Sequence, residues 1–475
     1  MMMFEPKRQH PAYIFIVLIE QIKTIFIPMI ILFISGNKGS LFQYLFAAVL
    51  VIFPVVSAVI KWYRFTYYIT EDEFRIRSGL FVIENTFIQK ERIQSVAIQA
   101  GFIQQLFNVV SVRIETAGGK KAEGVLNAIP KEEALTLRNE ILRLKKRANK
   151  KTETNEIADE SVAPVIDYSL TIENKKLILA GLTSFEVGVA FAVLASLYSQ
   201  IEELLPRSVY NAIYNQIQSF TYMMFLFAFL AALIIALIFA TLRYVLKFAH
   251  FTVQRKDDQI AIKRGLFEKS EFNLSIKRIQ GIVIEEGILR QLFGYATIYV
   301  EAVGMGDSQE NGRHVLHPFI KRKNAQLFLQ NFIPSITYDE IFHRAPKRAR
   351  RSYYLWSMFI FFLIASILVL LPFIQFWVYG LVLLGIFIGE MRYRYAGYTI
   401  VERTVIFRTG FFSRTTAILP KERIQVLTGK QTIFQKRSKL KTVYATILSS
   451  QFGRTYEVKH LEEKDVNRIL DWFCK

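Results

Sequence analysis

The five-residue stretch Lys90-Glu91-Arg92-Ile93-Gln94 decides the fold, because closely similar stretches occur twice more. The other copies are Ile276-Lys277-Arg278-Ile279-Gln280 and Lys421-Glu422-Arg423-Ile424-Gln425. In each copy a glycine precedes the arginine by 13 residues, at Gly79, Gly265 and Gly410. Three copies in constant register indicate an internal repeat, and a repeat sets the architecture of a chain.

The match continues beyond this stretch. Leu106-Phe107-Asn108 in the first copy aligns without a gap with Leu292-Phe293-Gly294 in the second. The third copy keeps the register but has Arg437-Ser438-Lys439 instead. The repeating unit is therefore much longer than the motif that reveals it.

Composition indicates membrane segments that alternate with soluble modules. The chain has 475 residues, enough for several domains, and 52% of them are hydrophobic. The net charge of +20 is compatible with nucleic acid, with anionic lipid, or with the excess of Lys and Arg on the cytoplasmic side of membrane proteins. The single cysteine, Cys474, excludes an intrachain disulfide and a cysteine-based zinc site.

Long apolar segments occur in three pairs, and each pair precedes one copy of the repeat. A spanning helix needs about 20 apolar residues, which these segments provide or approach. No small-residue cleavage site follows the first of them, so we expect an uncleaved anchor. The six segments run over residues 13–35, 41–62, 177–199, 218–242, 353–371 and 376–391.

After each pair the hydrophobic pattern changes to the period of a β-strand. Phe74-Arg75-Ile76-Arg77 alternates apolar and charged residues, as a half-buried strand does. Further strands are predicted over 86–89, 95–99, 109–115 and 125–129, with counterparts in the second copy. Helices are then expected from Pro130, near Pro318 and from Leu461. Each module thus reads as short strands closed by one helix.

The predicted plan is a membrane-spanning helical hairpin followed by a β-module, three times over. Each module lies after an even number of crossings, and Lys and Arg cluster in the modules. The positive-inside rule therefore predicts a multi-pass cell-membrane protein whose termini and modules are cytoplasmic. The boundaries are hairpin 1 at 1–62, module 1 at 63–147, a polar linker at 148–168, hairpin 2 at 169–246, module 2 at 247–341, a basic run with hairpin 3 at 342–391, and module 3 at 392–475.

The strand-rich unit containing the Gly79 and Arg92-Ile93-Gln94 elements resembles the bacterial pleckstrin-homology-like domain of membrane proteins, the bPH2 type. Three units, each led by a hairpin, resemble its YdbT-type members. The resemblance implies a seven-stranded sandwich closed by one helix. It also implies a scaffold that supports envelope integrity or stress resistance, with a smaller single-module relative or self-association as the partner. It implies no particular ligand, because a fold does not define a function.

The repeated Arg-Ile-Gln element has two interpretations. Its arginines offer planar donor forks that suit phosphate or carboxylate, so the element is a candidate anion site. Alternatively, each arginine bonds backbone carbonyls and fixes a turn, while the isoleucine fills the core. Repetition in every copy favours the structural interpretation. The residues are Arg92, Gln94, Arg278, Gln280, Arg423 and Gln425.

Basic residues also recur on the early strands of each module, close to membrane ends. In lipid-binding pleckstrin-homology domains, which this unit resembles, the first hairpin carries basic ligands for the headgroup. Each Lys or Arg near an anionic leaflet contributes roughly 1 kcal/mol, although a positive face can also serve orientation alone. The candidate lipid- or partner-binding residues are Arg75, Arg77, Lys263, Arg264, Arg408 and Arg414.

Glu186 lies well inside an apolar segment, where an ionisable group is costly and hence a functional candidate. It supports an alternative function, a transporter or channel. His314 and His317 have no third metal ligand nearby in the sequence. The residues contain no nucleophile–base pair, paired-acid site or phosphate loop. We therefore predict a non-catalytic membrane protein without cofactor or metal, whose modules bind a partner protein or anionic inner-leaflet lipid. Nucleic acid is not expected, because the aromatic residues cluster at membrane ends.

Overall fold

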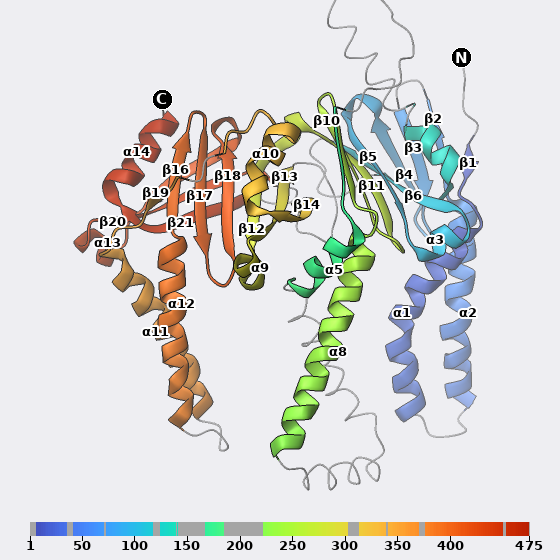
Figure 1. Ribbon diagram of the computed structural model, residues 1–475. Helices are drawn as coiled ribbons and strands as arrows, with labels where there is room; N and C mark the ends of the chain where they lie inside the picture. Colours follow the sequence, from blue (N-terminus) through green and yellow to red (C-terminus); the bar gives the residue numbers. More distant parts are fainter. Residues whose placement is uncertain are drawn as a thin grey trace, which may run out of the picture. The chain divides into compact units, whose positions relative to one another are not determined.

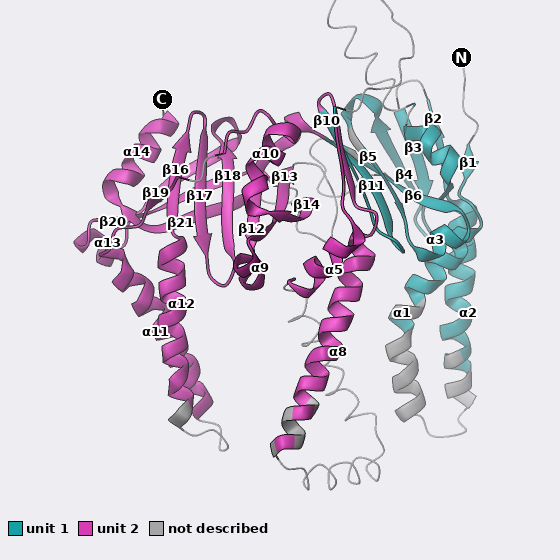
Figure 2. Ribbon diagram, in the orientation of Figure 1, with its two compact units in different colours: residues 1–167, 259–274, 304–306 teal, residues 168–258, 275–303, 307–475 magenta. Residues whose placement is uncertain are grey.

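The computed structural model describes residues 6–35, 41–70, 73–116, 124–138, 140, 167–184, 222–302, 313–338, 341–369, 376–449 and 453–474. The chain divides into two compact units (Figure 2). Unit 1 comprises residues 1–167, 259–274 and 304–306, and unit 2 comprises residues 168–258, 275–303 and 307–475. Both units combine antiparallel sheets with apolar helices, so the fold is mixed α+β (Figure 1).

Module 1, in unit 1, contains two antiparallel sheets whose inner faces share one core. Buried Phe74 and Ile76 alternate with Arg75 and Arg77, which confirms the predicted half-buried strand. Residues 131–138 are helical and close the core through Ala134 and Leu137. The first sheet is β1 (Lys7–Arg8), β2 (Thr66–Ile69), β3 (Glu73–Ser78) and β4 (Glu84–Gln89), and the second is β5 (Ile93–Ala100), β6 (Val109–Thr116) and β7 (Gly124–Pro130).

Module 2 repeats this pattern and contributes to both units. Two of its strands, β10 (Gln259–Arg264) and β11 (Lys269–Ser275), belong to unit 1. Its closing helix begins at Arg322, whereas the sequence predicted a start near Pro318. Pro318 instead lies inside a strand. The elements in unit 2 are β8 (Tyr168–Thr171), β9 (Thr252–Lys256), β12 (Ile279–Glu286), β13 (Tyr295–Ala302), β14 (Arg313–Lys321) and α10 (Arg322–Phe332).

Module 3 lies wholly in unit 2 and is also built from four strands and then three. Its core packs Tyr398 and Phe407 from the first sheet against Val443 and Val458 from the second. The amphipathic helix α14 (Glu463–Cys474) closes it through Val466 and Ile469. The strands are β15 (His343–Arg344), β16 (Gly397–Val401), β17 (Thr404–Gly410), β18 (Arg414–Pro420), β19 (Ile424–Lys430), β20 (Leu440–Ile447) and β21 (Arg454–Glu462).

Consecutive modules share their sheets, which was not predicted from the sequence. In unit 1, β5 of module 1 pairs antiparallel with β11, giving the local order β7-β6-β5-β11-β10. In unit 2, β12 of module 2 pairs with β18 of module 3 over Ile282–Glu286. The second sheet of one module therefore continues into the first sheet of the next through an unbroken backbone ladder.

The first strand of each module precedes the apolar helices of that module in the sequence. β1 pairs with β2, β8 with β9, and β15 with β16, and each of these pairs brackets the apolar helices in sequence. The predicted boundaries at 63, 247 and 392 each leave out this strand. The domain boundaries are corrected accordingly: each hairpin is an insertion within a module, after its first strand.

The apolar segments form helices where the structure describes them. Two described helical stretches, Phe229–Phe248 and Ala349–Val369, are long and apolar enough to cross a membrane. The part of the second hairpin over 185–221 lies outside the described residues, so three spanning hairpins stay a prediction. The helices are α1 (Ala12–Ser35), α2 (Leu41–Arg64), α5 (Asn174–Leu182), α8 (Tyr222–Phe248), α11 (Ala349–Val369) and α12 (Leu381–Tyr395), the last preceded by the 3-10 turn η3 (Phe376–Gly380).

Short helical elements recur at equal positions in the three modules. The Arg-Ile-Gln arginines end the 3-10 turns η1 (Lys90–Arg92), η2 (Ile276–Arg278) and η4 (Lys421–Arg423). The helices α3 (Phe102–Leu106), α9 (Ile288–Phe293) and α13 (Ile433–Arg437) follow. A left-handed residue comes after each of them, namely Asn108, Gly294 and Lys439. The third copy thus keeps the backbone geometry although its residues differ.

Candidate functional site

The hairpin between the third and fourth strands of a module lies at the end of the sheet where an apolar helix enters. In module 1, Thr66 lies two residues after the last residue of α2 and opposite Arg77 in the ladder. Arg64, the last residue of α2, donates from Nη1 to the carbonyl of Leu80 in that hairpin over 2.7 Å. In module 3, Gly397 follows α12 and lies opposite Arg408. We call this the helix end of each module.

The helix end carries exposed apolar side chains in every module. In module 1, Phe81 at the hairpin tip is 83% exposed, and Phe107 stacks on Phe15 of α1 at 5.5 Å. The other exposed apolar residues on the tips and short helices are Val82, Ile83, Phe102, Leu106, Leu266, Phe267, Ile288, Leu289, Leu292, Phe293, Phe411, Phe412, Ile433 and Phe434. Exposed apolar groups next to apolar helices fit a surface that meets the interface of a bilayer.

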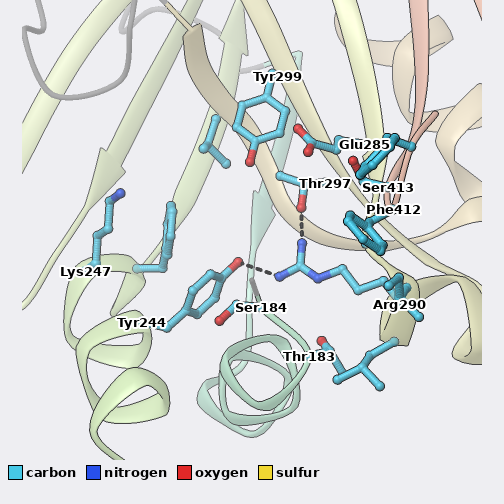
Figure 3. A pocket seen from close by; sticks show the side chains of 16 residues that line it. Thr183, Ser184, Tyr244, Lys247, Glu285, Arg290, Thr297, Tyr299, Phe412 and Ser413 are labelled. Atoms are coloured by element: carbon cyan, nitrogen blue, oxygen red, sulfur yellow. Dashed lines mark hydrogen bonds between the residues drawn. The ribbon is translucent and has the colours of Figure 1, made fainter. Parts of the chain in front are cut away.

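Unit 2 contains a groove of about 630 Å³ at the helix end of module 2 (Figure 3). Its floor is formed by Arg290 and Thr297, and α8 contributes Tyr244 and Lys247. Its apolar wall combines two side chains of α9 with the tip of the neighbouring β17–β18 hairpin: Ile288, Leu289, Phe411 and Phe412. The groove therefore joins polar and basic groups to an apolar wall.

Arg290 is the central polar residue of the groove, and only 6% of it is exposed. Its guanidinium donates to Thr297 Oγ1, and over 3.2 Å each to Tyr244 Oη and the carbonyl of Pro318. It also donates to the carbonyl of Ala180 over 3.0 Å. Nε has no hydrogen-bond acceptor within the described residues. All these acceptors are uncharged, so a buried cation lies beside the groove without a carboxylate partner among the residues that the structure describes.

The charge at position 290 is specific to module 2. The residues at the same place in modules 1 and 3 are Gln104 and Gln435, each in the third position of its short helix. Gln435 donates to Thr442, the counterpart of Thr297, over 2.8 Å. A glutamine therefore satisfies the packing role at this position. In module 2 the arginine adds a positive charge and hydrogen bonds to Ala180 and Tyr244.

A second set of arginines lies where module 2 joins module 3. Glu286 is fully buried and accepts hydrogen bonds from Arg322 and Arg414. Arg408 stacks over Phe342 at 4.1 Å and donates to the carbonyl of Tyr395. Burial, together with Arg414 and Arg322, lowers the pKa of Arg408 to about 10. Positive charge is therefore concentrated at this junction beyond what Glu286 neutralises.

Comparison with known proteins agrees with this repeat architecture. The family model of the bacterial PH domain matches three regions of the chain, residues 17–145, 190–333 and 358–474. The chain belongs to the bacterial PH domain family. It is 34% identical to the UPF0699 transmembrane protein YdbT of Bacillus subtilis (strain 168), across 99% of both chains. It is 31% identical to the UPF0699 transmembrane protein YdbS of the same organism over 111 residues, 23% of this chain and 65% of that relative.

These matches confirm the resemblance inferred from the repeated motif. The likeness to a transmembrane protein over the full length, together with two helices able to span a bilayer, makes the chain a membrane protein with repeated PH domains.

Most of the predicted basic residues are already engaged within or between the PH domains. Arg75 pairs with Glu73 at 3.0 Å, and Lys263 pairs with Glu271 at 3.3 Å. Burial alone would raise the pKa of Glu271, but the positive charges of Arg138 and Lys263 lower it below the usual value. Arg264 is buried, Arg408 and Arg414 lie at the module 2–3 junction, and Arg77 is exposed. The structure does not bring these six residues into one site.

Two residues of the Arg-Ile-Gln elements donate to backbone carbonyls. Arg423 donates from Nη2 to the carbonyl of Lys277 over 2.6 Å and so links the 3-10 turns of two successive PH domains. Gln280 donates to the carbonyl of Arg278 over 3.0 Å. Arg92 and Gln425 are exposed, and the side chain of Gln94 lies outside the described residues. Arg423 thus bonds a carbonyl of the preceding module and not of its own turn, and both interpretations of the element stay predictions.

Glu186 lies outside the described residues, so the transporter or channel alternative gains no geometry from the structure. His317 is buried: its Nδ1 accepts from the amide of Phe319, and burial lowers its pKa to about 3. No group of three metal-ligating side chains occurs among the residues that the structure describes.

Arg290 was not identified from the sequence. The sequence does contain a sign of Arg290, because alignment of the three copies places this arginine against the uncharged Gln104 and Gln435. A charge that appears in one copy of a repeat, at a position that is neutral in the others, is what distinguishes it.

Proposed function

We propose that the protein is a non-catalytic, multi-pass membrane scaffold whose PH domains rest on the cytoplasmic face and bind anionic phospholipid headgroups. A scaffold of this kind would support the integrity of the envelope or its resistance to stress. The observation that carries the proposal is the Arg290 groove, in which a buried cation without a carboxylate partner among the described residues lies beside an apolar wall.

The groove has the chemistry of a phospholipid at the bilayer surface. A phosphate diester in the groove would lie beside the positive charge of Arg290 and offers an acceptor to the Lys247 ammonium, and hydrogen bonds to charged groups are the strong ones. Phe411 and Phe412, with α9, would lie beside the first carbons of the acyl chains. The groove is at the end of α8, whose stretch Phe229–Phe248 is long enough to span the bilayer. The headgroup would thus bind at the depth where lipid phosphates are found.

We expect Arg290→Gln to lower the affinity for anionic lipid at least tenfold, since a hydrogen bond to a charged group is worth about 1.5–3 kcal/mol. The substitution introduces the residue that modules 1 and 3 carry at this place, so the fold should tolerate it. Binding would be measured on the full chain in nanodiscs that contain phosphatidylglycerol in a phosphatidylcholine background, by the lipid-dependent rise in melting temperature and by native mass spectrometry.

Lys247→Gln, at the edge of the groove, should weaken binding about fivefold, as expected for about 1 kcal/mol per basic residue near an anionic leaflet. Arg403→Gln is the matched control, because Arg403 pairs with Glu422 on the surface of module 3 and does not line the groove. Equal binding by Arg290→Gln and the unmodified chain would contradict the proposal. Stabilisation by inorganic phosphate alone would assign the groove to a free anion rather than to lipid.

The orientation can be tested with the natural sequence. Cys474 is the only cysteine of the chain and is exposed near the C-terminus. If the modules are cytoplasmic, a membrane-impermeant maleimide should leave Cys474 unlabelled in intact cells and label it in inverted vesicles. Labelling from outside intact cells would place α14 and module 3 on the opposite face and refute the cytoplasmic orientation.

A further inference from the structure

Successive modules are joined by pairing between two strand edges. The first and the last module of the chain each keep one of these edges unpaired within the described residues. The fourth strand of module 2 pairs with the fifth strand of module 1, and the same holds for modules 3 and 2. Among the described strands, β4 ends the first sheet of module 1, and β19 ends the second sheet of module 3. An open strand edge presents unpaired backbone donors and acceptors that can pair with another chain.

We propose that β19 of one chain pairs with β4 of a second copy, extending the junction already present twice within each chain. The two internal junctions have the same register: Gln99 lies opposite Ser270, and the equivalent Glu285 lies opposite Thr415. The same register between copies places Lys430 opposite Glu84 and Leu427 opposite Phe87.

These residue pairs are complementary. Lys430 and Glu84 carry opposite charges, and directly opposed charges of this kind stabilise a pair of strands. Leu427 and Phe87 take the places of Ile282 and Ile418, which are both fully buried where modules 2 and 3 meet. Phe87 is 58% exposed, whereas Ile418, at the equivalent position of the junction between modules 2 and 3, is fully buried.

The contacts beside the strands would also recur. Within the chain, Arg423 donates to the carbonyl of Lys277 in η2. Arg92 is the equivalent of Arg423 in module 1 and is exposed. In the proposed contact Arg92 would reach Glu422 of the other copy, which is the equivalent of Lys277. Gln105 in module 1 and Gln291 in module 2 donate to carbonyls of the next hairpin tip, those of Phe267 and Phe412. The equivalent residue of module 3 is Lys436, again a donor.

Exposure along β19 agrees with a missing partner strand. Every residue of β12 except Glu285 is buried, whereas in β19 only Ile424 is buried and Val426 is 53% exposed. The contact joins two different surfaces, β4 and β19, so it is heterologous and leaves one of each edge open on every dimer. Such contacts build rings or linear arrays, here within the plane of a membrane.

A disulfide trap in membranes tests this register. In a Cys474→Ser background, Glu84→Cys on one tagged chain would be co-expressed with Lys430→Cys on a second chain with a different tag. Directly opposed residues of antiparallel strands have Cα atoms about 4.5–5.5 Å apart, within the range that a disulfide bridges. Mild oxidation should give a species of twice the 55.2 kDa chain mass that carries both tags.

Val426→Cys is the matched control for Lys430→Cys. It lies on the same strand, but four residues away, or about 13 Å from the expected partner. Cross-linking at Val426 as strong as at Lys430, cross-linking between two Glu84→Cys chains, or no cross-linking in membranes would overturn the proposal. Capture at Lys430→Cys of a smaller PH-domain protein of the host, and not of the tagged copy, would also overturn it.

A charge exchange provides a second test without cysteines. Lys430→Glu alone and Glu84→Lys alone should each weaken self-association roughly tenfold in detergent, because each places like charges opposite one another. The chain carrying both substitutions should recover it. Association measured by light scattering that fails to recover in the double variant would exclude the proposed register.

Discussion

Glu286→Ala should destabilise the junction of β12 and β18 by about 3–5 kcal/mol, the usual effect of removing one partner from a buried ion pair. Glu286 is fully buried, and Arg414 donates to it from Nε over 2.9 Å. Arg322 binds the same carboxylate from the start of α10. Without the carboxylate, two largely buried guanidinium groups would face each other uncompensated.

Hydrogen exchange of the full chain in detergent would measure this effect locally. Backbone amides of β12 and β18 should exchange hundreds- to thousands-fold faster, since each 1.4 kcal/mol corresponds to a factor of ten. Glu422→Ala is the matched control. Its carboxylate pairs with Arg403 at 3.0 Å but is largely exposed, and exposed pairs contribute about 0–1 kcal/mol. Equal exchange in the two variants would show that the Glu286 cluster does not hold the junction.

Gly265→Ala should cost about 2–3 kcal/mol in the β10–β11 hairpin. Gly265 has φ +98°, a conformation that residues with a Cβ rarely adopt, and a Cβ placed there would lie 1.9 Å from the carbonyl oxygen of Glu268. The backbone would have to open the turn to relieve this clash. Faster exchange confined to β10, β11 and the adjoining β5 is the expected result.

Gly287→Ala serves as the control for the hairpin prediction. Gly287 has φ −64°, and no atom lies within 4 Å of the position of an added Cβ. Its substitution should change stability by no more than about 0.5 kcal/mol. If Gly265→Ala were equally mild, the constant spacing between glycine and arginine would need an explanation other than this turn.

Local sequence patterns predicted the modules well. Alternation around Phe74 and Ile76 fixed the strands, and constant spacing revealed the repeat, because both signals depend on contacts close in sequence. The strands β1 and β15 have only two residues each, too few to show any period. The shared sheets were not predicted, because the local sequence of an edge strand does not show which distant strand will pair with it.

The candidate site was harder to predict than the fold. Charge alone selected Arg75, Lys263 and Arg414, but whether a charge is available depends on neighbours distant in sequence. Glu271 binds Lys263 on the neighbouring strand of module 2, and Glu286 binds Arg414 across the boundary between modules 2 and 3. Arg290, in contrast, lies in a stretch that reads as an ordinary amphipathic turn, and its burial without an acidic partner among the described residues is visible only in three dimensions.

If each pair of apolar helices crosses the membrane as proposed, its position after the first strand couples the folding of the module to membrane insertion. During synthesis β15 leaves the ribosome before α11 and α12, and its partner β16 leaves after them. If only one of the two helices crossed the bilayer, β15 and β16 would emerge on opposite sides and could not pair. The sheet can therefore be completed only when both ends of the hairpin lie on the same side of the bilayer. A chain inserted with an odd number of crossings would leave β15 and β16 unpaired and the sheet of the module incomplete.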